Sequence, residues 1–118
     1  MRLAVAAVLT LICVPAMAQS SPAIQATCER HMAPPYAKQG AVLDCGCVAR
    51  FLTDRYGAAD AAAIVRFFGA GASGSEKEIE AAIKEIGGDR IRAILNMVGR
   101  FQDLGRDIDQ ACPEVKKP

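Results

Sequence analysis

The four cysteines that follow residue 18 constrain the fold more than any other feature of the sequence. Cys28, Cys45, Cys47 and Cys112 are spread over most of a chain of 118 residues, and two of them flank a single glycine. An even number of cysteines in a short exported chain is typical of a disulfide framework, which holds distant segments side by side. We therefore predict two disulfides, and the open question is which cysteines pair.

Residues 1–18 have the three-part pattern of a cleaved secretory signal peptide. Arg2 precedes an apolar run, and residues 16–18 are Ala-Met-Ala, which fits the small residues that signal peptidase requires. The apolar run is shorter than the ~20 residues that a membrane-spanning helix needs. We expect cleavage after Ala18, export to the periplasm or the outside of the cell, and loss of Cys13 with the signal peptide.

Residues 19–118 have balanced charge and the length of one domain. The whole sequence has 14 basic and 13 acidic residues, so loss of Arg2 leaves 13 of each and a net charge of zero. That balance does not favour binding to nucleic acid or to an anionic membrane surface. No apolar run after residue 18 is long enough for a transmembrane helix, so we expect a single soluble domain.

Apolar residues repeat at helical spacing, and no segment shows the alternation of a strand. We predict helices over residues 22–31, 41–56, 58–68, 76–86 and 90–111, with residues 114–118 as a frayed tail. Ser75 to Glu78 is a capping box that begins the fourth helix. Gly46 inside a helix costs about 1 kcal/mol relative to alanine, and we expect it to allow close approach of a neighbouring helix. The predicted fold is all-α, a small domain of four to five helices stapled by two disulfides.

Helical geometry separates the side chains of Cys45 and Cys47. Residues two apart on a helix point about 200° apart around its axis, so each sulfur should reach a different neighbour. One partner is Cys28 on the preceding helix, and the other is Cys112 at the end of the last helix. We slightly prefer the pairs Cys28–Cys45 and Cys47–Cys112 over the alternative Cys28–Cys47 and Cys45–Cys112, but the sequence leaves both open.

Two other chemistries would use the same cysteines. Cys45 and Cys47 as a dithiol would act in redox exchange, although thiol–disulfide oxidoreductases typically carry Cys-x-x-Cys in a thioredoxin-like fold. A copper or zinc site would draw on four ligands at close to zinc-site spacing: Cys28, His31, Cys45 and Cys47. Met32 beside the histidine would suit Cu(I). Disulfide formation in an oxidising compartment competes for the same thiolates, so we expect neither a metal nor a cofactor.

One glycine pattern matches a nucleotide-binding motif literally. Residues 69–74 read Gly-Ala-Gly-Ala-Ser-Gly, which is G-x-G-x-x-G. That motif needs a preceding strand within a βαβ unit, whereas residues 58–68 are predicted to be helical, so we interpret residues 69–74 as a loop between helices. His31 is the only histidine of the chain, and no Ser-His-Asp or Cys-His catalytic set is assembled around it. We therefore expect no enzymatic activity.

The helical Cys-x-Cys formed by Cys45 and Cys47 resembles that of plant non-specific lipid transfer proteins, in which the two cysteines bond to different partners. The resemblance covers these two residues and their helical setting. Half of that family's cysteines, including its Cys-Cys pair, have no counterpart in this chain, so lipid transport does not carry over.

For the function, we predict a small secreted or periplasmic protein that binds an unknown protein partner through a helical face. The first alternative is a thiol-redox or metal-binding protein that uses the Cys-Gly-Cys motif at residues 45–47. The second is a carrier of a small apolar ligand, which would need a cavity between the helices.

Overall fold

A computed structural model describes residues 21–113 and 115–116, and the predicted signal peptide lies outside them. The helices are α2 (Ser21–His31), α3 (Ala33–Lys38), α4 (Cys45–Tyr56), α5 (Ala58–Ser73), α6 (Glu76–Ile86), α7 (Gly88–Val98) and α8 (Phe101–Ala111). Two short strands, β1 (Ala41–Val42) and β2 (Val115–Lys116), pair antiparallel with Ala41 opposite Lys116. The prediction of an all-α domain with two disulfides is confirmed, but the described residues contain seven helices rather than four to five.

The additional helices arise at one glycine and at a pair of prolines, where the structure has helix boundaries that were not predicted. Gly99 has φ 79° and ψ −118°, a conformation that residues with a side chain rarely adopt, and it divides the predicted helix over residues 90–111 into α7 and α8. The helix predicted over residues 22–31 ends at His31 as expected, but a further helix, α3, follows it. Pro34 and Pro35 lie in the first turn of α3, where an N–H group has no intrahelical acceptor and its loss costs little.

The helix with the Cys-Gly-Cys motif begins at Cys45 rather than at residue 41. Asp44 is its N-cap, and the side-chain oxygen of Asp44 accepts a hydrogen bond of 3.1 Å from the backbone N–H of Cys47. Aspartate is among the best residues at this position because it satisfies one of the unpaired N–H groups of the first turn. Residues 41 and 42 form β1 instead, and their partner β2 falls within residues 114–118, the segment predicted as a frayed tail.

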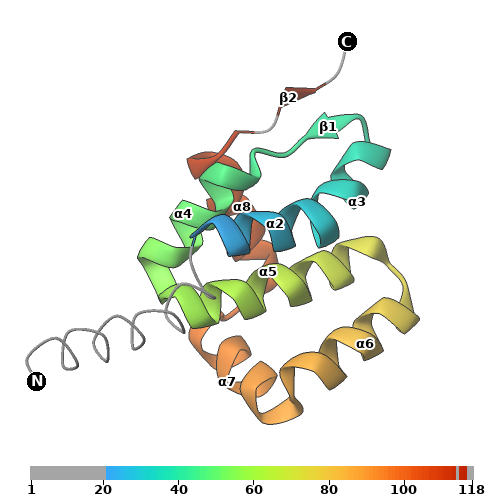
Figure 1. Cartoon of the computed structure of the whole chain (residues 1–118), viewed down its shortest axis with the longest axis vertical. Coiled ribbons are helices and arrows are strands. Elements are labelled where there is room, and N and C mark those ends of the chain that lie inside the picture. The colour runs from blue at the N-terminus through green and yellow to red at the C-terminus, as the bar shows by residue number, and fades with distance from the viewer. Residues whose placement is uncertain (1–20, 114, 117–118) are drawn as a thin grey trace, which may run out of the picture.

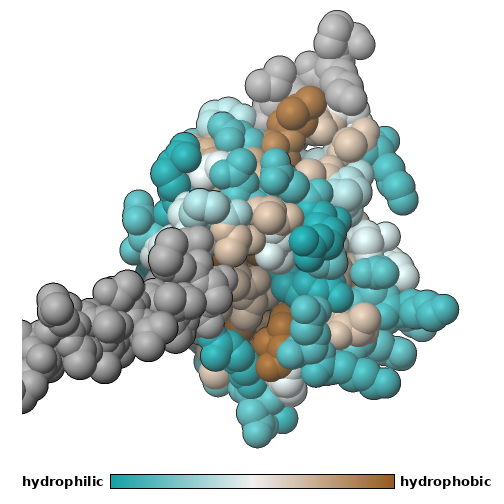
Figure 2. All heavy atoms as spheres, viewed as in Figure 1, coloured by the Kyte–Doolittle hydropathy of each residue, from teal (hydrophilic) through white to brown (hydrophobic). Residues whose placement is uncertain are grey.

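Helix α5 is the central element of the domain. In Figure 1 it crosses the middle of the molecule, with α2 and α3 above it and α6 and α7 below it. Its residues Ala61, Ile64 and Val65 are fully buried. The other elements add further buried side chains to the same core: Ile24, Met32, Val48, Leu52, Ile94, Leu104 and Ile108. Figure 2 shows that hydrophilic side chains dominate the described part of one face, with hydrophobic ones in small separate patches, as expected when helices turn their apolar stripes inward.

A close crossing of α2 and α5 occupies the region where the sequence predicted a loop. Helix α5 continues through Ser73 and ends at Gly74, which is in the left-handed conformation. A Cβ atom on Gly69 would lie 2.5 Å from the carbonyl oxygen of His31 at the end of α2, so only glycine permits this contact. A Cβ atom on Gly46 would meet nothing closer than 3.4 Å, an ordinary contact. The close approach that we expected at Gly46 was therefore wrong, and it occurs at Gly69.

We predict that Gly69→Ala lowers the free energy of unfolding by about 1–3 kcal/mol, the usual cost of overpacking, because the atom it would meet belongs to the backbone. Gly71→Ala is the matched control, since it lies on the same helix and a Cβ atom there meets nothing within 4 Å. Alanine's better helix propensity should raise stability at that position by up to about 1 kcal/mol. Chemical denaturation measures both variants, and equal stability of the two would contradict the close crossing.

Candidate functional site

The first turn of α4 carries both cysteines of the Cys-Gly-Cys motif, and each is bonded to a different helix. Cys45 forms a disulfide with Cys28 of α2, with a Cα–Cα distance of 5.6 Å. Cys47 forms a disulfide with Cys112, the residue after α8, with a Cα–Cα distance of 5.8 Å. The bonds span 17 and 65 residues of sequence, so α4 is tied to segments that precede and follow it at very different distances along the chain.

The disulfides leave no thiol available to the two alternative chemistries. Cys28, Cys45 and Cys112 are at most 4% exposed, and Cys47 is partly buried. Because all four sulfurs are bonded in this way, Cys45 and Cys47 do not form a dithiol pair, and they do not join His31 as metal ligands. Within residues 21–113 and 115–116, no group of three or more His, Cys, Asp or Glu side chains is placed to hold a metal ion.

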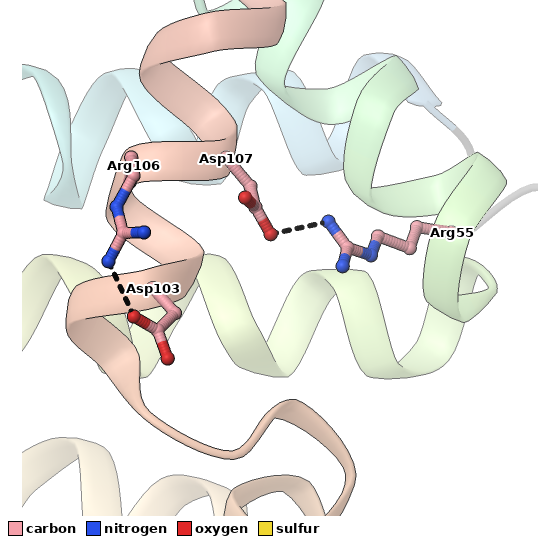
Figure 3. Close-up of polar contacts among 4 residues, drawn as sticks. All are labelled: Arg55, Asp103, Arg106 and Asp107. Carbon is pink, nitrogen blue, oxygen red and sulfur yellow. Dashed lines mark hydrogen bonds and ion pairs between the residues drawn. The ribbon is translucent and has the colours of Figure 1, made fainter.

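A surface ion pair adds a second connection between α4 and α8. Figure 3 shows Arg55 of α4 extending to Asp107 of α8, with Nη1 of the arginine 2.9 Å from Oδ2 of the aspartate. Arg106 pairs with Asp103 one turn earlier on α8, at 2.7 Å. These side chains are substantially exposed, and such pairs contribute about 0–1 kcal/mol each. Only the Arg55–Asp107 pair joins α8 to another helix, whereas the Cys47–Cys112 disulfide and the buried side chains Leu104 and Ile108 attach α8 to the rest of the domain.

An open groove with apolar walls lies between α5, α6 and α8. Its volume is about 440 Å³, within the range of about 300–1,000 Å³ that is typical of ligand-binding pockets. The residues that line it come from all three helices: Phe67, Phe68, Gly71, Ala72, Ile79, Phe101, Gln102 and Gly105. None of these residues carries a formal charge, and only the glutamine has a polar side chain.

Three phenylalanine side chains line the groove, and one of them contacts the other two. The ring of Phe101, at the start of α8, lies 5.5 Å from the ring of Phe67 and 5.9 Å from that of Phe68, measured between centroids. The second pair is edge-to-face, an arrangement that aromatic rings favour. All three rings are only partly buried. Opposite them, Ile79 of α6 forms a wall, and Ile83, one turn further along that helix, is 39% exposed.

The sequence does not predict the groove. Apolar residues at helical spacing are expected in the core, and Phe68 and Phe101 do pack against it although they also line the groove. One signal was present, because adjacent residues on a helix point about 100° apart and two neighbouring phenylalanines therefore cover a wide face of the helix. The sequence does not indicate which ring would be left near the surface.

His31 lines a polar cleft between α2, α5, α6 and α7. Burial lowers the pKa of its imidazole below 6.5, and the positive charges of Arg66 and Arg30 lower that pKa further. Glu85 and Glu78 oppose the shift. These effects together favour the neutral form of the imidazole, which is surrounded by charged side chains of both signs.

Across the part of the chain that the structure describes, no helix is both long and apolar enough to cross a membrane. Comparisons of the chain with protein-family models, with curated proteins and with solved structures give no match.

We predict that the two disulfides form independently of each other. Replacing Cys47 and Cys112 by alanine should expose no free thiol, because the other bond is intact, and the same should hold when Cys28 and Cys45 are replaced. Replacing one member of each bond, Cys45 and Cys112, should expose two. Thiol alkylation of the denatured, unreduced variants followed by intact mass counts these thiols.

The stability of the first two variants gives a second readout. Loop-closure entropy predicts how much each variant's free energy of unfolding falls. The decrease is about 3 kcal/mol when the Cys28–Cys45 bond, which spans 17 residues, is removed, and about 4 kcal/mol when the Cys47–Cys112 bond, which spans 65, is removed. A variant without Cys45 and Cys112 that exposes no free thiol would contradict the connectivity.

Proposed function

We propose that this chain is a non-enzymatic interaction protein of the periplasm or the extracellular space, and that it binds an apolar segment of a protein partner in the groove between α5, α6 and α8. The observation that carries the proposal is the open, uncharged groove lined by Phe67, Phe68 and Phe101. An apolar groove of this kind on the surface of a small domain is typical of an interaction site.

The chemistry of the groove supports binding rather than catalysis. Its lining contains no His, Cys, Ser, Asp or Glu side chain, so it offers no nucleophile, general acid or general base. Affinity there would come from removing apolar surface from water, at roughly 25 cal/mol per Å². Gln102 is the one side chain in the lining that can fix the orientation of a partner by hydrogen bonding.

The shape of the groove supports a helical or extended peptide segment over a small ligand. Pockets for small ligands bury about 70–90% of the surface of their ligand, whereas this groove is open to solvent along one side. Helices form its walls, and the exposed Ile83 continues the apolar surface along α6. An amphipathic partner helix with apolar anchors at positions i and i+4 fits such a surface.

The compartment assignment rests on the cysteines. Two disulfides that both join distant segments are typical of proteins that fold outside the cytosol. The signal-peptide pattern of residues 1–18 points in the same direction.

We predict that Gly71→Glu weakens binding of an amphipathic helical peptide with one leucine-rich face by at least about tenfold, because it places a charge in the apolar groove. Gly88→Glu is the matched control. A Cβ atom meets nothing within 4 Å at either glycine, and neither has a positive φ. Residue 88 lies in the first turn of α7, where glutamate is favourable, and it lines none of the clefts described above.

Fluorescence anisotropy of the labelled peptide measures both dissociation constants. Equal binding by the two variants, or no binding to the unaltered protein, would contradict the proposed groove. Binding of a fatty acid to the unaltered protein, without binding of the peptide, would favour a carrier of apolar ligands instead.

A further inference from the structure

The guanidinium group of Arg66 is buried with part of its hydrogen-bonding capacity unused. The side chain is 10% exposed, and Nε donates a hydrogen bond of 2.7 Å to Oε2 of Glu85. Nη1 is buried and has no acceptor among the described residues. A guanidinium carries five N–H donors, and a buried donor without an acceptor costs roughly 1–3 kcal/mol or more when it is charged. Such a group is stabilised by any acceptor that can enter beside it.

Arg66 faces a cleft of about 320 Å³ that has more positive than negative side chains. Its charged lining residues come from four helices: Arg30 of α2, Arg66 of α5, Glu85 of α6 and Arg90 of α7. Glu85 is paired with Arg66, and Arg90 is paired with Asp60 at 3.0 Å. Arg30 has no ion-pair partner in the described part of the chain. The cleft therefore has an excess of positive charge at its wall.

We propose that this cleft binds a small oxyanion, such as a carboxylate, sulfate or phosphate group, with the Arg66 guanidinium as its anchor and Arg30 and Arg90 beside it. The planar fork of arginine matches the oxygen atoms of these groups and can hold them through paired hydrogen bonds. The carboxylate of Glu85 occupies one edge of the fork, and its side chain is 62% exposed, so it can move outward to admit a ligand. This site is separate from the apolar groove and does not rest on the function proposed for that groove.

His31 provides a direct reporter of the cleft. It is the only histidine of the chain, so in a protein without a histidine tag its imidazole proton signals need no assignment. His31 also lines a second cleft, between α2, α3, α5 and α6. The charged side chains around these two clefts are Arg30 of α2, Lys38 of α3, Arg66 of α5, Glu78 and Glu85 of α6, and Arg90 of α7. A bound anion offsets the positive charges in this set and favours the protonated imidazole, so it raises the pKa of His31.

The experiment is a proton NMR titration of His31 from pH 5.5 to 8 in sodium chloride, sodium sulfate and sodium acetate at equal ionic strength. We expect the pKa of His31 to be below 6.5 in chloride. In sulfate, acetate or both, we expect a higher pKa, whose rise levels off as the concentration of the anion increases. A larger rise in sulfate identifies a tetrahedral oxyanion as the ligand class, and a larger rise in acetate identifies a carboxylate. The same pKa in all three salts would overturn the proposal, because it would show that ions act only by screening.

Three variants locate the anion. Arg66→Gln should weaken the apparent affinity for the anion by about tenfold or more, as expected for loss of a charge-assisted hydrogen bond. Glu85→Gln should strengthen it, because it removes the competing carboxylate from the guanidinium. Arg55→Gln removes an exposed arginine from the α4–α8 surface and should leave the affinity unchanged.

Arg66→Gln and Glu85→Gln should change the affinity for the anion in opposite directions. A general loss of folding cannot produce this result, because it would lower the affinity in both variants. If Arg66→Gln does not fold, Glu85→Gln decides, because the side chain of Glu85 is mostly exposed and glutamine keeps an oxygen atom that can accept the hydrogen bond from Nε of Arg66. Weaker or unchanged anion binding in Glu85→Gln would overturn the assignment of Arg66 as the anchor. An equal loss of affinity in Arg55→Gln and Arg66→Gln would do the same, since it would reflect only the net charge of the protein.

Discussion

The disulfide clamp at the first turn of α4 is the constraint on which the rest of the structure depends. Cys45 and Cys47 lie on one helical turn but are bonded to opposite parts of the chain, one to α2 and the other to the residue after α8. Helix α8 has 11 residues and buries only Leu104 and Ile108, so it is too short to be stable alone. Because α8 also supplies Phe101 to the groove, we expect the groove to depend on the clamp.

Helix α5 places two different surfaces on the two sides of the domain. Its close crossing with α2 at Gly69 fixes its orientation, since the contact leaves no room for a side chain. Arg66 then faces the polar cleft, while the next two residues, Phe67 and Phe68, face the apolar groove. Consecutive residues on a helix differ by about 100° in direction, so a single turn serves both sites. The cleft is suited to an oxyanion and the groove to an apolar chain, and neither requires the other to be occupied.

The elements that depend on local chemistry could be predicted from the sequence, and those that depend on tertiary contacts could not. The helical class followed from apolar spacing. The N-cap half of the predicted capping box is confirmed, since Ser75 accepts a hydrogen bond of 3.3 Å from the N–H of Glu78, but the N–H of Ser75 donates to Oγ of Ser73 at 3.2 Å instead of to Glu78. Helix α3 was not predicted, because prolines follow the end of one helix and begin another equally well. The break at Gly99 and the close contact at Gly69 look like any helical glycine in the sequence, and only the packing of other helices distinguishes them. The groove and the buried Arg66 could not be predicted for the same reason. Whether a phenylalanine ring or a guanidinium group is exposed depends on the side chains that pack around it in the folded domain.

Hydrogen exchange, measured by mass spectrometry, tests most directly whether the clamp holds α8 and the groove together. The comparison is between the unaltered protein and the variant in which Cys47 and Cys112 are replaced by alanine. We predict that amides in α8 lose most of their protection, while those in α2, α4 and α5, which share the core and the Cys28–Cys45 bond, remain protected. Unchanged protection of α8 in this variant would contradict the account, because the helix would then be held by its core contacts alone.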